Sequence, residues 1–351
     1  MGLNEKFFKS AAGGVVAADN FNTVLYTGNA GASNTTSQSI TSVGFQPDLV
    51  WVKNRDNANN HVLFDSIKGA TNWLNSNNNF NEYSNSTTAG ASFLSNGFTT
   101  GTSDQTNKSS NNLVSWSWKA GGAAVNGSGT NVTSVKVSAN QDAGFSIVKY
   151  NYQSSSAATI SHGLNEAPEM VIVKPYNSTL GSTWFVYHSS LCAGKEMYLN
   201  NNSANGSDSN RWNNTAPTAS VFSIGTSFGS YPSYYHGDHI AYCFHSVDNY
   251  QKVGSYTGAG SAGLTVTTGF RPRWVMIKRT DSANDWVIID SIRDTSDPYS
   301  KILWADLSDT EADGGSTSAL SFSDTGFSMS TSSVGSSINA SGGNYIYLAI
   351  A

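Results

Sequence analysis

The sequence predicts an all-β protein made of three tandem antiparallel β-sandwich repeats, jelly-roll-like and about 100 residues each. Short apolar runs rich in Val, Ile, Tyr, Trp and Phe alternate with clusters of Gly, Asn, Asp and Ser, which is typical of strands and turns. Four sequence landmarks recur three times in the same order. The length of 351 residues fits three units of that size.

The first two landmarks open each repeat. One is a strand with a tyrosine near its end, at residues 21–28, 145–150 and 250–258. The other is a turn and a proline that lead into an apolar strand ending in lysine, at residues 44–53, 163–174 and 269–278. In each copy the lysine follows the proline by six residues, as Pro47 and Lys53 illustrate. The proline stands where a missing N–H costs a strand least, and the glycine before it supplies the turn.

The last two landmarks close each repeat. A strand runs into an Asp or His followed by Ser at residues 62–66, 184–189 and 286–291. Pairs of closing strands follow at residues 97–101 and 113–118, 221–225 and 239–244, and 326–330 and 345–350. We expect the repeated Asp-Ser to cap or close the turn after its strand. Six tryptophans fall on these strands and are expected in the core or between repeats: Trp51, Trp116, Trp118, Trp184, Trp274 and Trp286.

These landmarks predict the organisation of the chain. We expect a docking arm (1–18), a first repeat (19–120), a linker (121–140), a second repeat (141–247) and a third repeat (248–351). Because few residues join the second and third repeats, we expect these two to pack closely and the first to sit further away.

Composition excludes several functional classes. Charged residues make up 12% of the chain and the net charge is −5, without a basic run, so a nucleic-acid partner is not expected. There is no long apolar segment that predicts membrane insertion. The first residues lack the apolar stretch of a secretory signal, so we expect synthesis in a cytoplasm without the usual export. No cofactor is expected.

At residues 44–55, 61–66 and 116–122 the chain resembles a family of large phage-encoded proteins of uncharacterised function, found in viruses of marine bacteria. Residues 143–148, 167–174 and 268–280 resemble the same family. The resemblance covers almost the whole chain after residue 19. It implies a virion structural protein, made in the host cytoplasm and attached to fibres or other surface parts, and it implies no catalytic residues.

Two neighbouring segments are candidate binding sites. Tyr231, Tyr234 and Tyr235 lie in a loop without strand alternation, and aromatic rings beside polar side chains hold sugars or protein partners. His236, Asp238 and His239 are ligand types for zinc. The simpler interpretation of the second set is a hairpin turn, because the spacing of a tight metal motif is missing.

Candidate catalytic residues have less support in the sequence than these candidate binding sites. His61, Asp65 and Ser66 include triad residue types, but a triad is defined by geometry, and the third repeat has Asp290 and Ser291 without a matching histidine. Carboxyl pairs suited to glycoside cleavage, Glu166 with Glu169 and Asp285 with Asp290, are better explained as solvated turns. We therefore expect no enzymatic activity.

The arm carries Phe7 and Phe8 among small residues and cannot bury them alone, so they are expected to contact another subunit or the particle. The favoured function is a virion structural protein, either a tail-fibre receptor-binding part or a head decoration. Its partners would be other virion proteins, further copies of itself in a homo-oligomer such as a trimer, and a host surface glycan. The alternatives are a lectin-like carbohydrate-binding module and a polysaccharide depolymerase.

Overall fold

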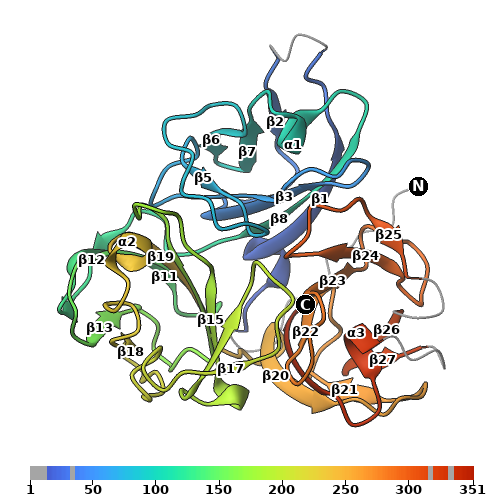
Figure 1. The fold of residues 1–351 in the computed structure, drawn as a ribbon. Helices are drawn as coiled ribbons and strands as arrows, with labels where there is room; N and C mark the ends of the chain where they lie inside the picture. The colour runs from blue at the N-terminus through green and yellow to red at the C-terminus, as the bar shows by residue number, and fades with distance from the viewer. Residues whose placement is uncertain (1–13, 32–35, 315–318, 331–335) are drawn as a thin grey trace.

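The computed structural model describes residues 14–31, 36–314, 319–330 and 336–351, and in these segments the chain is all-β (Figure 1). Antiparallel strands form three large and three small sheets. The helices of the described residues are short: α1 (Asp104–Asn107), α2 (Pro232–Tyr235), α3 (Ser336–Asn339), and the 3-10 turns η1 (Ala17–Asp19) and η2 (Ser189–Leu191). The all-β class predicted from the sequence is confirmed.

Each large sheet is accompanied by a small one, and we call each such pair a unit. Unit 1 has a five-stranded sheet in the order β1-β8-β3-β4-β5 and a small sheet β2-β7-β6. Its strands are β1 (Phe21–Thr27), β2 (Gln38–Ile40), β3 (Leu49–Asn54), β4 (Val62–Asp65), β5 (Trp73–Leu74), β6 (Gly90–Leu94), β7 (Gly97–Thr100) and β8 (Asn112–Trp118).

Unit 2 has an eight-stranded sheet in the order β17-β16-β15-β14-β19-β12-β11-β9 and a small sheet β10-β13-β18. Its strands are β9 (Val125–Asn126), β10 (Gly129–Thr130), β11 (Thr133–Asn140), β12 (Phe145–Tyr152), β13 (Ala158–Ser161), β14 (Met170–Pro175), β15 (Phe185–His188), β16 (Lys195–Tyr198), β17 (Gly206–Ser207), β18 (Val221–Ile224) and β19 (Gly237–Phe244). The stretch 121–140, expected as a linker, thus contributes β9, β10 and β11 to the sheets of unit 2.

Unit 3 has a six-stranded sheet in the order β20-β28-β22-β23-β24-β25 and a small sheet β21-β27-β26. Its strands are β20 (Gln251–Thr257), β21 (Thr265–Thr267), β22 (Trp274–Arg279), β23 (Val287–Asp290), β24 (Lys301–Trp304), β25 (Ala312–Asp313), β26 (Leu320–Ser323), β27 (Gly326–Met329) and β28 (Asn344–Ile350).

One strand order is common to the large sheets. The strand of the first landmark (β1, β12 or β20) pairs with the last strand of its unit, and the last strand pairs with the strand of the proline-to-lysine landmark. That strand pairs in turn with the next strand along the chain. The registers agree, because the opening pairs are Phe21 with Trp118, Phe145 with Phe244, and Gln251 with Ile350. The turn glycines before β3, β14 and β22 all have positive φ, at Gly44 (90°), Gly163 (75°) and Gly269 (92°), as a turn at these points requires.

Each unit has its own hydrophobic core between its large and small sheets. In unit 1, for example, Ile40 and Phe98 of the small sheet share a core with Val50 and Val52 of β3. Units 2 and 3 have corresponding cores. The other face of each large sheet turns away from this core and needs a second cover.

These outer faces of the large sheets pack against one another in a fourth hydrophobic core, which all three units share. It contains Trp116 from β8, Tyr242 from β19 and Leu348 from β28, together with Trp118 and Trp274. Figure 1 shows the three large sheets around this common centre. Because both faces of β3 and β14 are covered, every residue of these strands is buried. The expectation that the first repeat sits further away from the others is therefore wrong.

The described end of the N-terminal arm lies on this core. Val15 and Ala17 pack against it and are partly buried. Phe7 and Phe8, predicted as assembly contacts, lie outside the described residues.

Candidate functional site

Three equivalent backbone hydrogen bonds join the units head to tail. In each, an N–H that follows β5, β16 or β24 donates to a carbonyl two residues after the lysine of the next unit in the cycle. They run from Glu82 N to Tyr176 O (2.9 Å), from Asn205 N to Thr280 O (2.8 Å) and from Glu311 N to Arg55 O (2.8 Å). The third bond returns from unit 3 to unit 1, so the units form a closed ring.

The Asp or His of the third landmark lies at the same three junctions. Asp65 accepts a hydrogen bond from the Tyr242 hydroxyl (3.1 Å), which unit 2 supplies, and Asp290 accepts one from the Trp116 indole (3.1 Å), which unit 1 supplies. His188 holds the corresponding place in unit 2, and burial lowers its pKa to about 4. The junction sites therefore combine packing with buried polar contacts.

These residues also cap turns, as the sequence predicts. Oδ1 of Asp65 accepts the N–H of Lys68 (2.9 Å), and Oδ1 of Asp290 accepts that of Arg293 (2.8 Å). His61 accepts instead from the Trp51 indole at 2.8 Å. Asp65 and His61 thus form their hydrogen bonds with residues outside the supposed triad. This supports the interpretation that these triad residue types stabilise the fold. All six tryptophans singled out from the sequence are buried, as predicted.

The predicted tyrosine site lies on α2 and the residue before it. Tyr231 and Tyr234 are 62% and 43% exposed, whereas Tyr235 is half-buried. The rings of Tyr231 and Tyr234 each lie 6.1 Å from that of Tyr235. Two tyrosine side chains therefore project from a turn whose third tyrosine is anchored.

A buried arginine anchors Tyr235. The Arg211 guanidinium lies 5.3 Å from the Tyr235 ring and 4.2 Å from the Phe185 ring. Its charge is compensated by Glu196 at 2.9 Å and Asp208 at 3.4 Å. A cation held between aromatic faces and carboxylates gives α2 a rigid base.

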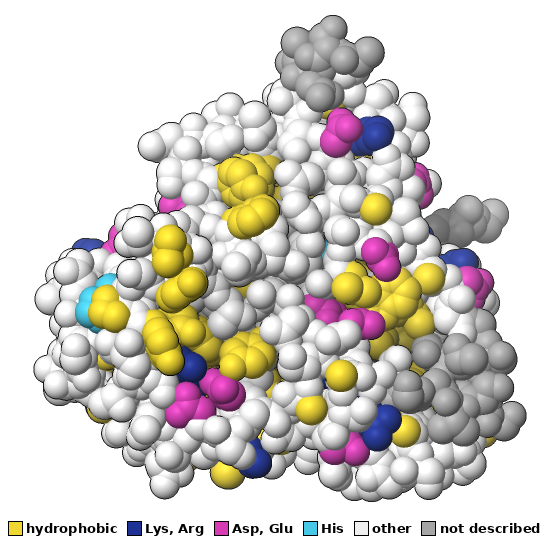
Figure 2. Space-filling model, in the orientation of Figure 1, with side chains coloured by type: hydrophobic (Ala, Val, Ile, Leu, Met, Phe, Trp, Pro, Cys, Tyr) yellow, Lys and Arg dark blue, Asp and Glu magenta, His cyan; other side chains and the backbone are white. Residues whose placement is uncertain are grey.

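Two further apolar side chains extend this surface across the junction of units 1 and 2. Leu180 is 58% exposed and Phe80 is 57% exposed. The Leu180 N–H donates to Ser233 O of α2 (3.0 Å), and the Ser182 N–H donates to the carbonyl of Asn79, the residue before Phe80 (2.9 Å). We call Phe80, Leu180, Tyr231 and Tyr234 the aromatic ridge. Figure 2 shows hydrophobic side chains gathered on this face over α2, β19 and β15.

Sequence reasoning found the tyrosines of the ridge but missed Phe80 and Leu180. The available signal was an apolar side chain in a polar loop: Phe80 follows three asparagines and precedes Asn81, and Leu180 stands between Thr179 and Gly181. Both loops look like ordinary connections until the fold brings them beside α2.

The predicted metal residues are engaged inside unit 2. The His239 ring stacks on Tyr150 at 4.8 Å, and burial lowers the pKa of His239 to about 4. Asp238 accepts a hydrogen bond from the Asn151 amide (2.8 Å). Among the described residues no three His, Cys, Asp or Glu side chains gather so that they could hold a metal ion. Metal binding by His236, Asp238 and His239 stays a prediction.

One buried carboxyl has a strongly altered pKa. Burial, with a smaller contribution from the charge of Asp285, raises the pKa of Asp306 from 3.8 to about 7. Asp306 accepts the Trp286 N–H (2.9 Å) at the start of β23. The other two units use an amide in this place: Asn77 accepts from His61 N (3.0 Å) and Asn200 from Trp184 N (2.9 Å). The position therefore needs an acceptor but no charge.

Replacing Asp306 by asparagine is expected to stabilise the protein at pH 8 by about 2–4 kcal/mol, since each pKa unit corresponds to about 1.4 kcal/mol. An acid with a raised folded-state pKa contributes stability below its unfolded pKa and loses it as pH rises through the folded value, here between about 4 and 7. Urea unfolding at pH 4 and pH 8 measures this. The exposed Asp324→Asn is the control, and an Asp306→Asn gain that is equal at both pH values would contradict the argument.

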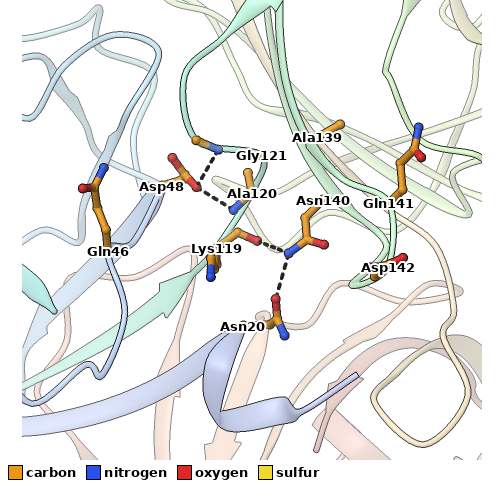
Figure 3. Close-up of a pocket in the computed structure, with 11 residues that line it drawn as sticks. Asn20, Gln46, Asp48, Lys119, Ala120, Gly121, Ala139, Asn140, Gln141 and Asp142 are labelled. Atoms are coloured by element: carbon orange, nitrogen blue, oxygen red, sulfur yellow. Dashed lines mark hydrogen bonds between the residues drawn. The ribbon is translucent and has the colours of Figure 1, made fainter. Parts of the chain in front are cut away.

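An open pocket lies where the chain passes from unit 1 to unit 2 (Figure 3). It measures about 680 Å³. Asp48 accepts the N–H groups of Ala120 (2.8 Å) and Gly122 (3.3 Å), and the Asn140 amide donates to Asn20 (2.8 Å). These bonds tie the crossing chain to both units. At the next crossing Glu169 accepts the Ser246 N–H (2.6 Å) in the same way, so we interpret the pocket as a joint.

Comparison with known proteins gives one family. A family model described as a domain of unknown function (DUF7483) matches residues 16–351. No curated protein and no solved structure matches the chain. In the described part of the chain, no helix has the length and apolar character needed to span a membrane.

Proposed function

Because this chain belongs to the DUF7483 family, whose function is unknown, we propose its role from its own residues and geometry. We propose a non-enzymatic structural protein of a bacteriophage particle, placed on the tail as a receptor-binding part or on the head as a decoration. The proposed partners are other virion proteins, further copies of the chain in a homo-oligomer, and a host surface glycan. The sequence resemblance to phage-encoded proteins and the low share of charged residues support this role.

We further propose that the three units are tandem β-sandwich repeats of one ancestral domain. The common strand order supports this, as do the matching registers of the opening strand pairs. The three junction hydrogen bonds at corresponding positions support it as well. On this proposal one chain holds the three-fold arrangement that fibre proteins commonly obtain from three chains.

The observation that carries the functional proposal is the closure of the ring from unit 3 back to unit 1. The backbone bond between Glu311 and Arg55 is reinforced by their side chains, which form an ion pair at 2.6 Å. In a closed ring with a shared core each unit contacts both of the others, so no unit can open independently. Such a structure suits a part that must persist on a particle outside the cell. The exposed aromatic ridge gives such a part a surface for contact.

Gold-labelled antibody against this chain is expected to decorate purified particles of the phage that encodes it, as seen by negative-stain electron microscopy. Label on tail fibres or the tail tip would identify a receptor-binding part, and label over the head would identify a decoration. Particles that lack this chain, made by deleting its gene, are the control. If wild-type particles carry no more label than these, the virion role is overturned.

A further inference from the structure

The three junctions of the ring have the same backbone geometry but carry different side chains at the surface. Phe80 stands two residues before the N–H that bonds across the first junction. Ser203 and Asp309 stand in the same place at the other two junctions, and both are exposed. A junction of this kind therefore forms without an aromatic residue, and the fold does not explain an exposed Phe80.

The same comparison applies to Leu180. The loops that correspond to its own in units 1 and 3, residues 54–60 and 279–285, contain Ala58 and Ala283 as their sole apolar residues. Leu180 is exposed and bonds to α2 through its backbone, so its side chain is not needed to hold the loop. An exposed leucine is thus present in this loop at one junction, whereas the corresponding loops at the other two junctions have only an alanine.

The short helix of unit 2 departs from its counterparts as well. In α1 the Asn107 side chain accepts the Asn29 N–H (2.9 Å), and in α3 the Asn339 side chain accepts the Ala259 N–H (2.8 Å). The sequence of α2 contains no asparagine and places tyrosines there instead. Three departures from the common pattern, in two units, meet at one surface, which indicates that this surface is selected for binding.

We propose that the aromatic ridge binds a neutral glycan. Aromatic rings stack on the apolar faces of sugars, and nearby amides and hydroxyls bond the sugar hydroxyls. Exposed polar neighbours of the ridge are uncharged: Asn79, Asn177, Thr179, Ser230 and Ser233.

The charges beneath the ridge are already compensated. Arg211 pairs with Glu196 and Asp208 as described above, and Lys68 pairs with Asp65 at 3.1 Å and Glu82 at 3.4 Å. A charged polysaccharide would find no free counter-charge among these groups, whereas a neutral one needs none. The inference deepens the proposed function by naming the class of ligand, and it rests on the repeat comparison.

Affinity electrophoresis of the full chain tests the proposal. Native gels would contain a β-glucan, a mannan, a galactan or, as the charged comparison, alginate. We expect at least one neutral polysaccharide to retard the protein, with a dissociation constant that 1 M NaCl changes by less than about twofold, since the contact involves no ion pair. Alginate is expected to cause no retardation.

Two variants locate the site. Phe80→Ser combined with Leu180→Ala introduces the residues found at the second junction, Ser203 in the place of Phe80 and Ala283 in the loop that corresponds to that of Leu180. This variant is therefore expected to fold normally and to weaken binding at least tenfold. Tyr231→Ala with Tyr234→Ala is expected to do the same. Val125→Ser, which changes an exposed apolar residue of β9 outside the ridge, is the matched control and is expected to bind like the wild type. Circular dichroism confirms folding of each variant.

The outcomes separate this inference from the proposed function. No retardation by any neutral polysaccharide, or retardation that the ridge variants leave unchanged, overturns the glycan site. If ridge variants instead fail to enter particles while no glycan binds, the ridge is a protein contact and the inference is wrong. Glycan binding by a chain that antibody does not find on particles would support the site and overturn the virion role.

Discussion

Replacing Asp290 by alanine is expected to lower the free energy of unfolding by about 3–5 kcal/mol, because the buried cation of Arg293 loses its nearer carboxylate and keeps only Glu311, at 2.9 Å. Asp290 and Arg293 form an ion pair at 2.6 Å in which both side chains are inaccessible to solvent. The same carboxylate accepts the Trp116 indole N–H from unit 1. The substitution thus removes an ion pair and a contact between the last and first units together. Urea unfolding followed by circular dichroism measures the loss.

An exposed ion pair of the same unit provides the control. Lys301 lies 3.2 Å from Asp313, with side chains 36% and 58% exposed, so Lys301→Ala is expected to cost less than about 1 kcal/mol. Asp290→Asn retains the shape but not the charge and should fall between the two. Equal effects of Asp290→Ala and Lys301→Ala would show that the buried pair does not stabilise the junction.

Replacing Trp274 by alanine is expected to cost about 3–5 kcal/mol through the cavity it leaves in the shared core. The Trp274 ring of unit 3 lies 5.7 Å from Trp118, 6.0 Å from Phe21 and 6.4 Å from Trp116, all in unit 1. Since the core is common, we expect all units to unfold in one transition, before and after the substitution. Hydrogen exchange measures this, and protection should fall in strands of every unit, including β12.

Leu25→Ala, at an exposed position of β1, is the control for Trp274→Ala and is expected to change stability by less than about 0.5 kcal/mol. Faster exchange confined to unit 3 would contradict the prediction. It would mean that the central core packs the units together without coupling their stability.

Sequence patterns predicted which residues form strands, but they did not predict which parts of the chain pack against those strands. The proline-to-lysine runs become β3, β14 and β22, and the run of each is continuous rather than alternating because both faces of the strand are buried. A continuous apolar run shows that a strand has two covers, but not which part of the chain supplies the second. The central core, and with it the position of unit 1, could therefore not be read from spacing.

For the candidate site, too, the sequence predicted some residues and missed others. Tyr231 and Tyr234 were predicted as a binding surface because three tyrosines in one short polar segment are a local signal. Phe80 and Leu180 lie far from them in the sequence and are brought beside α2 by backbone hydrogen bonds. A surface assembled across a junction has no local signal, so it appears only when the three units are compared in space.

The ring closure has a consequence for the synthesis of the protein. Arg55 leaves the ribosome long before Glu311, its junction partner, and the tryptophans Trp51, Trp116 and Trp118 leave it before the β22 and β28 residues that cover them. Contacts of such wide sequence separation form late in folding. The nascent chain must therefore carry an uncovered tryptophan-rich sheet face through most of translation, which is the kind of surface that chaperones bind and that aggregates at high expression. Slower translation or chaperone co-expression is expected to raise the soluble yield of this chain.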